Sequence, residues 1–184
     1  MSEKKTKKGR RAYLNDFRQG ADGKYVYTGA HYELQPREKL PSFRWRLLLF
    51  SVLMAAVTVA RGCNPAGGML NCFYVILPYI LEVGGVAFTV YAALSFLLSA
   101  YPAREYRFLK TVRRLPALAG FSATCAGVGV FVQGIYLILH RGAGQTLPLI
   151  LAGFLAEACS IAFSLMLRRL CQKAEFTRTP GENE

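Results

Sequence analysis

Four long apolar blocks, nearly free of charged residues, are the feature that most constrains this sequence. They cover approximately residues 43–60, 73–100, 117–139 and 146–167. A helix needs about 20 apolar residues to cross the hydrocarbon core of a bilayer. Lysines and arginines fill the intervals between alternate blocks, so the residues are segregated by the solvent that they prefer. We therefore predict an all-α integral membrane protein with four transmembrane helices arranged as two antiparallel hairpins.

The distribution of positive charge predicts the orientation of these helices. Of the 23 lysines and arginines, all but Arg61 and Arg141 lie at or before the start of the first block, between the second and third blocks, or after the fourth. The positive-inside rule places such residues in the cytoplasm. Both termini are therefore expected to be cytoplasmic, and the plasma (inner) membrane is the expected location. Because topology already explains the net charge of +12 and no nucleic-acid-binding motif accompanies it, we expect no nucleic-acid partner.

A basic and aromatic arm, residues 1–42, precedes the first block. Ala12–Gly20 places its apolar residues on one side, which predicts a short amphipathic helix. Lys24–Leu34 alternates aromatic with small or polar residues, which predicts a β-hairpin that reverses near Thr28 and Gly29. Its tyrosines either recognise another protein or pack on the headgroup layer. The candidates for partner binding are Tyr25, Tyr27 and Tyr32.

Basic and aromatic residues at the cytoplasmic ends of the helices are expected to contact lipid headgroups. The connector between the second and third blocks interleaves basic with apolar residues, so anionic lipid is its expected partner. The last segment, residues 168–184, is expected to be a loose cytoplasmic tail. The predicted headgroup contacts are Arg44, Trp45, Arg46, Arg104, Arg107, Lys110, Arg113, Arg114, Arg168 and Arg169.

Two glutamates lie within the predicted hydrocarbon region, Glu82 in the second block and Glu157 in the fourth. An ionised carboxylate there costs a few kcal/mol or more unless it is paired. Small residues share a helix face with each glutamate, which allows close helix packing. Gln133 of the third block can reach a similar depth. We therefore expect Glu82, Gln133 and Glu157, with Tyr79 assisting, to form an intramembrane polar cluster.

Three interpretations of this cluster agree with the sequence. In the first, protonated carboxylates donate hydrogen bonds that fix the register of the helices. In the second, a glutamate faces a cation of another subunit, because the sequence has no lysine or arginine within its own predicted hydrocarbon region. In the third, the carboxylates form the site of a proton- or cation-coupled transporter.

The sequence carries no recognisable catalytic or metal-binding signature. Its five cysteines form no Cys-x-x-Cys pair, and His31 and His140 lie far apart, so neither a zinc site nor another cofactor is expected. Asp16 and Asp22 are the only aspartates and both belong to the arm, which leaves no Ser-His-Asp arrangement to assemble. We do not expect an enzyme.

Cys63 and Cys72 share the predicted loop between the first two helices. In an oxidising compartment they could form a disulfide; the alternative is two ordinary thiols.

An accessory or structural subunit of a larger membrane complex is the function that these observations favour. The expected partner is another membrane protein or a second copy of the chain. The alternative is a small proton- or cation-coupled transporter that uses Glu82 and Glu157.

Overall fold

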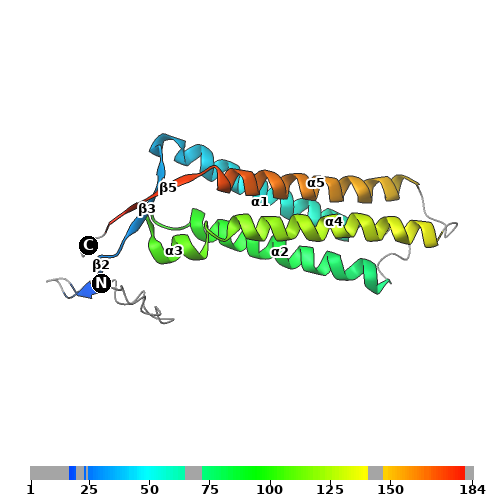
Figure 1. Cartoon of the computed structure of the whole chain (residues 1–184), viewed down its shortest axis with the longest axis horizontal. Helices are drawn as coiled ribbons and strands as arrows, with labels where there is room; N and C mark the ends of the chain where they lie inside the picture. The colour runs from blue at the N-terminus through cyan, green and yellow to red at the C-terminus, as the bar shows by residue number, and fades with distance from the viewer. Residues whose placement is uncertain (1–16, 20–22, 24, 65–71, 141–146, 181–184) are drawn as a thin grey trace, which may run out of the picture.

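The computed structural model describes residues 17–19, 23, 25–64, 72–140 and 147–180. Within them, four helices are long and apolar enough to cross a membrane, which confirms the predicted number of long apolar helices. These helices are α1 (Leu40–Gly62), α2 (Phe73–Leu97), α4 (Leu115–Leu139) and α5 (Leu147–Gln172). Figure 1 shows them side by side in an elongated bundle, with the strands β2, β3 and β5 at one end.

The four helices form a closed ring around one interior. Consecutive helices make two hairpins, α1 with α2 and α4 with α5 (Figure 1). The most extensive packing joins α4 to α2 and to α5, and α1 to α5 and to α2. The order around the ring is therefore α1, α2, α4, α5, and the diagonal pairs are α1 with α4 and α2 with α5.

All four helices differ from the predicted spans mainly at the strand end of the bundle, and α5 differs most, because it continues to Gln172. Prolines occupy the first turns of α1 and α4, where the missing N–H has no helical partner to lose. With proline in the first turn, α1 begins at Leu40 and α4 begins at Leu115, each a few residues ahead of its apolar block. The end of α2 at Leu97 is capped by Arg44, whose Nη2 donates to the carbonyls of Leu97 at 2.8 Å and Ser99 at 3.4 Å.

Small residues let the helices approach one another closely. A Cβ at Gly85 of α2 would lie 2.6 Å from Ser122 Oγ and 2.9 Å from Phe121 Cδ1 on α4. Next to it, a Cβ at Gly84 would meet nothing within 4 Å. The α2–α4 contact therefore depends on the glycine at position 85 and not on the one beside it.

A three-stranded antiparallel sheet closes the strand end of the bundle. Its central strand is β3 (His31–Gln35), flanked by β4 (Ala103–Arg104) and β5 (Glu175–Thr179). The sheet joins the segment before α1, the connector after α2 and the segment after α5. The prediction of a loose C-terminal tail is therefore wrong for β5.

The predicted hairpin reversal at Thr28 and Gly29 is also wrong. The strand before this point, β2 (Tyr25–Tyr27), pairs instead with β1 (Phe17–Gln19), and among the described strands β3 pairs with β4 and β5. A two-stranded hairpin standing alone is marginally stable, whereas β3 gains a supported position on the helix ends. Phe17–Gln19 is a strand, which contradicts the amphipathic helix predicted there; residues 12–16 and 20 lie outside the described part.

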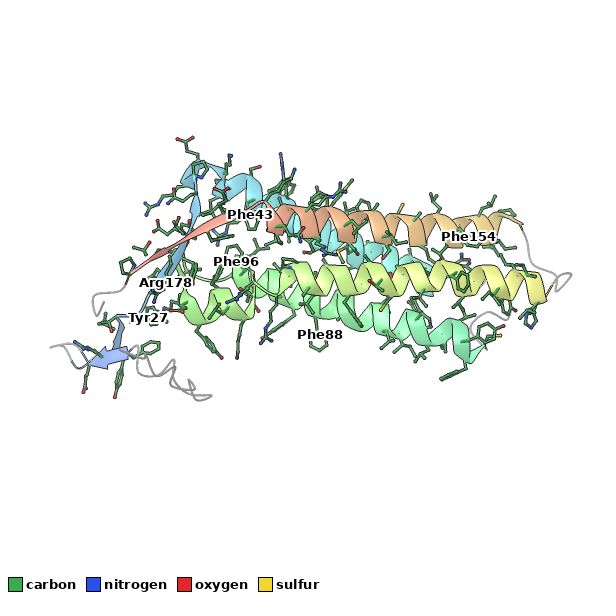
Figure 2. The ribbon with its side chains drawn as sticks, viewed as in Figure 1. Tyr27, Phe43, Phe88, Phe96, Phe154 and Arg178 are labelled. Carbon is green, nitrogen blue, oxygen red and sulfur yellow. The ribbon has the colours of Figure 1, made fainter. Side chains whose placement is uncertain are left out.

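An aromatic cluster attaches the sheet to the helices. Phe43 of α1, Phe96 of α2 and Phe176 of β5 meet edge to face, with ring centroids 5.8 to 6.3 Å apart. Figure 2 shows Phe43 and Phe96 at the strand end of the bundle. Tyr32 of β3 stacks on Phe108 at 4.2 Å, in the short helix α3 (Glu105–Lys110). The 3₁₀ helix η2 (Arg37–Lys39) then leads from β3 into α1.

Adjacent glycines provide a matched test of this packing. We expect Gly85→Ala to lower the free energy of unfolding by about 1–3 kcal/mol, because the added methyl group overpacks the α2–α4 contact. Gly84→Ala should instead be neutral or stabilise by up to about 1 kcal/mol, because alanine loses less entropy in a helix. Thermal unfolding of both variants in the same detergent checks this. Equal effects would contradict the close approach at Gly85.

Candidate functional site

The candidate site is a buried cluster of charged and polar groups built around Arg61. Arg61 lies in the last turn of α1, where a cation is favoured by the negative end of the helix dipole. Gly62, the last residue of α1, lies against the Tyr79 side chain. Since Tyr79 is the seventh residue of α2, α1 ends about 9 Å short of the start of α2. The Arg61 side chain is therefore inside the bundle and only 10% exposed.

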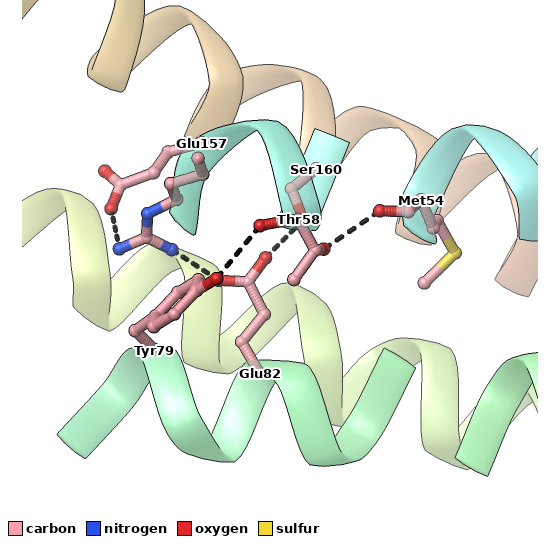
Figure 3. A network of polar contacts seen from close by, with 7 residues as sticks. Met54, Thr58, Tyr79, Glu82, Glu157 and Ser160 are labelled. Carbon is pink, nitrogen blue, oxygen red and sulfur yellow. Dashed lines mark hydrogen bonds and ion pairs between the residues drawn. The ribbon is translucent and has the colours of Figure 1, made fainter. Parts of the chain in front are cut away.

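Arg61 bridges the two glutamates. Its Nη1 donates to Glu82 Oε2 at 2.5 Å, and its Nη2 forms an ion pair with Glu157 Oε1. Both carboxylates are fully buried, at 0% exposure. Figure 3 shows the guanidinium between Glu157 and Glu82. The arrangement is an ion triad, Glu82–Arg61–Glu157, that connects α2, α1 and α5.

Neutral polar groups occupy the remaining lone pairs of the triad. Ser160 of α5 donates to Glu82 Oε1 at 2.5 Å, which joins the diagonal helices α5 and α2 (Figure 3). The Gln133 amide of α4, with its nitrogen turned toward the carboxylate, donates to Glu157 Oε2 and Oε1 at 3.0 and 3.2 Å. All four helices therefore contribute a side chain to the cluster. The additional hydrogen bonds help to offset the cost of burying the charges.

Tyr79 supports Arg61 from the side. The guanidinium carbon lies 5.1 Å from the centre of the Tyr79 ring, a cation–π distance,. The Tyr79 hydroxyl donates to the Thr58 carbonyl at 3.1 Å, near the end of α1. Tyr79 therefore holds both the charge of Arg61 and the backbone that carries it.

The site also requires a glycine on α4. A Cβ at Gly129 would lie 2.8 Å from Glu157 Oε1 and 2.9 Å from Arg61 Nη2. At Gly127 and Gly134 of the same helix a Cβ would meet nothing within 4 Å. Gly129 thus leaves room for the ion pair between Arg61 and Glu157.

The structure brings together the four residues predicted for the cluster, Glu82, Gln133, Glu157 and Tyr79, but it centres them on a fifth that the sequence prediction missed. We expected that no lysine or arginine of this chain could pair with the glutamates. This prediction is wrong, because Arg61 reaches inward from the end of α1. A cation from another subunit is therefore not needed. Two signals could have identified Arg61. It follows Thr58 by three residues on the buried face of α1, and the two glutamates within the apolar helices required a cation.

The predicted partner-binding tyrosines are not equivalent. Tyr25 is 73% exposed. Tyr27 is half-buried: its hydroxyl donates to the Ala30 carbonyl at 3.1 Å, and its ring lies 5.2 Å from the Arg104 guanidinium. Tyr32 stacks on Phe108. Only Tyr25 of the three therefore presents a free aromatic surface.

The predicted headgroup residues also divide. Arg44 caps α2 and Arg104 contacts the rings of Phe17 and Tyr27. The others, all exposed, lie at the strand end of the bundle: Trp45, Arg46, Arg107, Lys110, Arg113, Arg114, Arg168 and Arg169.

Cys63 and Cys72 are both free cysteines. The disulfide that their shared loop suggested is not formed in this structure. Among the described residues, no group of three or more His, Cys, Asp or Glu side chains is placed to hold a metal ion.

Comparisons with protein-family models, with curated proteins and with solved structures found no match for this chain.

Removing the charge of Arg61 tests what the triad does. We expect Arg61→Gln to lower the free energy of unfolding by about 3–5 kcal/mol, because two buried carboxylates lose their cation. The triple variant Arg61→Met, Glu82→Gln, Glu157→Gln should recover most of this loss, since it removes the charges together. Thermal unfolding in detergent provides the measurement. Arg113→Gln, at an exposed position, is the control, and a loss of stability in it equal to that of Arg61→Gln would contradict a specific role for the triad.

Proposed function

We propose that the protein is a multi-pass protein of the plasma (inner) membrane, with both termini in the cytoplasm, that serves as an accessory or structural subunit of a larger membrane assembly. The observation that carries this proposal is the internally satisfied ion triad. Its charges are engaged by side chains of the same chain from all four helices. Groups used in this way hold helices together, so the bundle suits the role of a rigid platform.

The outer surface of the bundle supports the membrane setting. In each of the four long helices, no more than 39% of the most apolar 18-residue stretch is buried inside the bundle. The remaining apolar surface, which includes Ile80, Phe88 and Tyr91 on α2, requires lipid or another protein to cover it. With Arg61 paired inside the bundle, Arg141 is the only remaining basic residue that opposes the positive-inside count,.

The strands at the other end supply a surface for a partner. In Figure 1 the β2 strand lies away from the helices, beyond the sheet of β3 and β5. Tyr25 and Val26 of β2 are 73% and 53% exposed. Exposed tyrosines are typical of surfaces that recognise proteins, and Val26 extends the apolar area beside Tyr25. The β1–β2 hairpin is therefore our candidate for the contact with the assembly.

Purification in mild detergent from the native membrane tests the proposal. We expect a membrane protein to accompany the chain in a fixed ratio and to be lost from the variant Tyr25→Ser, Val26→Ser, because that change removes the apolar surface of β2. Quantitative mass spectrometry measures the ratio. The matched control is Thr177→Ala, Thr179→Ala on the exposed strand β5, which should retain the partner. Recovery of a homo-oligomer alone would count against the platform.

A small proton- or cation-coupled transporter is the second candidate, and the charge of the triad favours it. Two carboxylates face one guanidinium, so the ionised triad carries one excess negative charge, which a proton or a cation would neutralise. Ser160 and Ser164 continue from Glu157 along the buried face of α5, both at 0% exposure. Ser164 Oγ has no hydrogen-bond partner in the described part of the chain. Buried carboxylates followed by hydroxyls are groups that can pass a proton.

Flux measurements distinguish the two candidates. A transporter requires that Glu82→Gln and Glu157→Gln abolish proton uptake into proteoliposomes, followed with an entrapped pH-sensitive dye, while leaving thermal stability nearly unchanged. If the protein is instead a structural subunit, the wild type should show no proton uptake above that of empty liposomes, and both variants should have reduced thermal stability. Ser164→Ala is the matched control for the hydroxyl path: it should slow uptake only in the transporter.

A further inference from the structure

A surface cavity lies on the outside of the bundle, away from the triad. It is a groove of about 650 Å³ where the end of α2 faces α3 and the start of α4. One wall is apolar and comes from α2, with Phe88, Tyr91 and Leu98. The rim is cationic, with Arg107 and Lys110 from α3 and Arg114 at the start of α4, and among the described residues no acid lines it.

The apolar wall has the length of one lipid chain. Phe88, Tyr91 and Leu98 are 65%, 71% and 83% exposed, and Figure 2 shows Phe88 on the outer side of α2. Ten residues separate Phe88 from Leu98, which is about 15 Å of helix. One leaflet of a bilayer has a hydrocarbon thickness of about 15 Å, half of the full core. An acyl chain lying against α2 would therefore cover this wall from end to end.

The cationic rim sits where a headgroup would be. Lys110 contacts the Tyr106 hydroxyl and lies 4.4 Å from the centre of that ring, so its position is fixed by its own helix. Thr111 Oγ1 donates to the Arg107 carbonyl at 2.7 Å, which fixes the end of α3. Three positive charges around one groove attract a phosphate, and two of them are guanidinium groups that can bind it through two hydrogen bonds each.

A second groove at the strand end of the bundle is less suited to an anion, although it also has three cations. It has a volume of about 480 Å³ and lies between the ends of α1 and α5. Its cations are Lys39, Arg46 and Lys173, but Glu175 also lines it. The carboxylate would repel an anion, so the first groove is the better site for a phosphate.

From this arrangement we propose that the α2–α3 groove binds one anionic phospholipid, with its phosphate on Arg107, Lys110 and Arg114 and one acyl chain along Phe88 to Leu98. The proposal rests on the membrane setting proposed above and is independent of the platform role.

Competition between two lipids tests this site in the full-length protein. The wild type is reconstituted into nanodiscs of phosphatidylcholine with increasing phosphatidylglycerol, and retained lipid is counted by native mass spectrometry. We expect one retained phosphatidylglycerol. The variant Arg107→Gln, Arg114→Gln should lose preference for it by roughly 30-fold, from about 1 kcal/mol for each basic residue. Arg113→Gln, Arg169→Gln is the matched control, since it removes two exposed arginines that do not line the groove.

A second variant separates the groove from general surface charge. Ser95→Trp places a large side chain in the groove without changing any charge, and it should abolish retention of the lipid. Its thermal stability in phosphatidylcholine nanodiscs should equal that of the wild type, which shows that it folds. Equal losses in both arginine pairs, or full retention in Ser95→Trp, would overturn the proposal. Equally strong competition by soluble glycerol phosphate would overturn the acyl-chain contact. Absence of the wild type from the membrane fraction would instead refute the membrane setting.

Discussion

The pairing of one guanidinium with two buried carboxylates is the interaction on which the rest of the structure depends. Glu82 and Glu157 are fully buried, and neither could remain ionised in an apolar interior without a cation. Arg61 can reach both only because α1 ends inside the bundle and because Gly129 leaves room beside it. The depth of α1, the close contact with α4 and the pairing of the diagonal helices by Ser160 all follow from that requirement.

The helices could be predicted from the sequence because apolar length is a local property. The polar cluster was also predictable in part, since a carboxylate in an apolar helix needs a partner wherever it occurs. Arg61 escaped because it precedes Gly62, Asn64 and Pro65, residues typical of a loop, and because positive charges at helix ends are usually assigned to water. Its long side chain allows the charge to lie deep while the backbone remains near the end of the helix.

The sheet could not be predicted for a different reason. The partners of β3 arrive about 70 and 140 residues later in the chain, so no local pattern names them. The alternation of aromatic residues correctly indicated strands but assigned β3 to the nearest partner, β2. What decides the pairing is the support from Phe43, Phe96 and Phe108 on the helix ends, which exists only after the bundle has formed.

That order of events has a consequence for biosynthesis. β4 follows β3 by about 70 residues, and β5 follows it by 140. At a translation rate of about 5–20 residues per second, β3 waits roughly 7–30 s for its last neighbour. During that interval the open edges of β3 can pair with other chains, since β4, which is made first, is only two residues long. The sheet is therefore complete only after the final helix, α5, has been made.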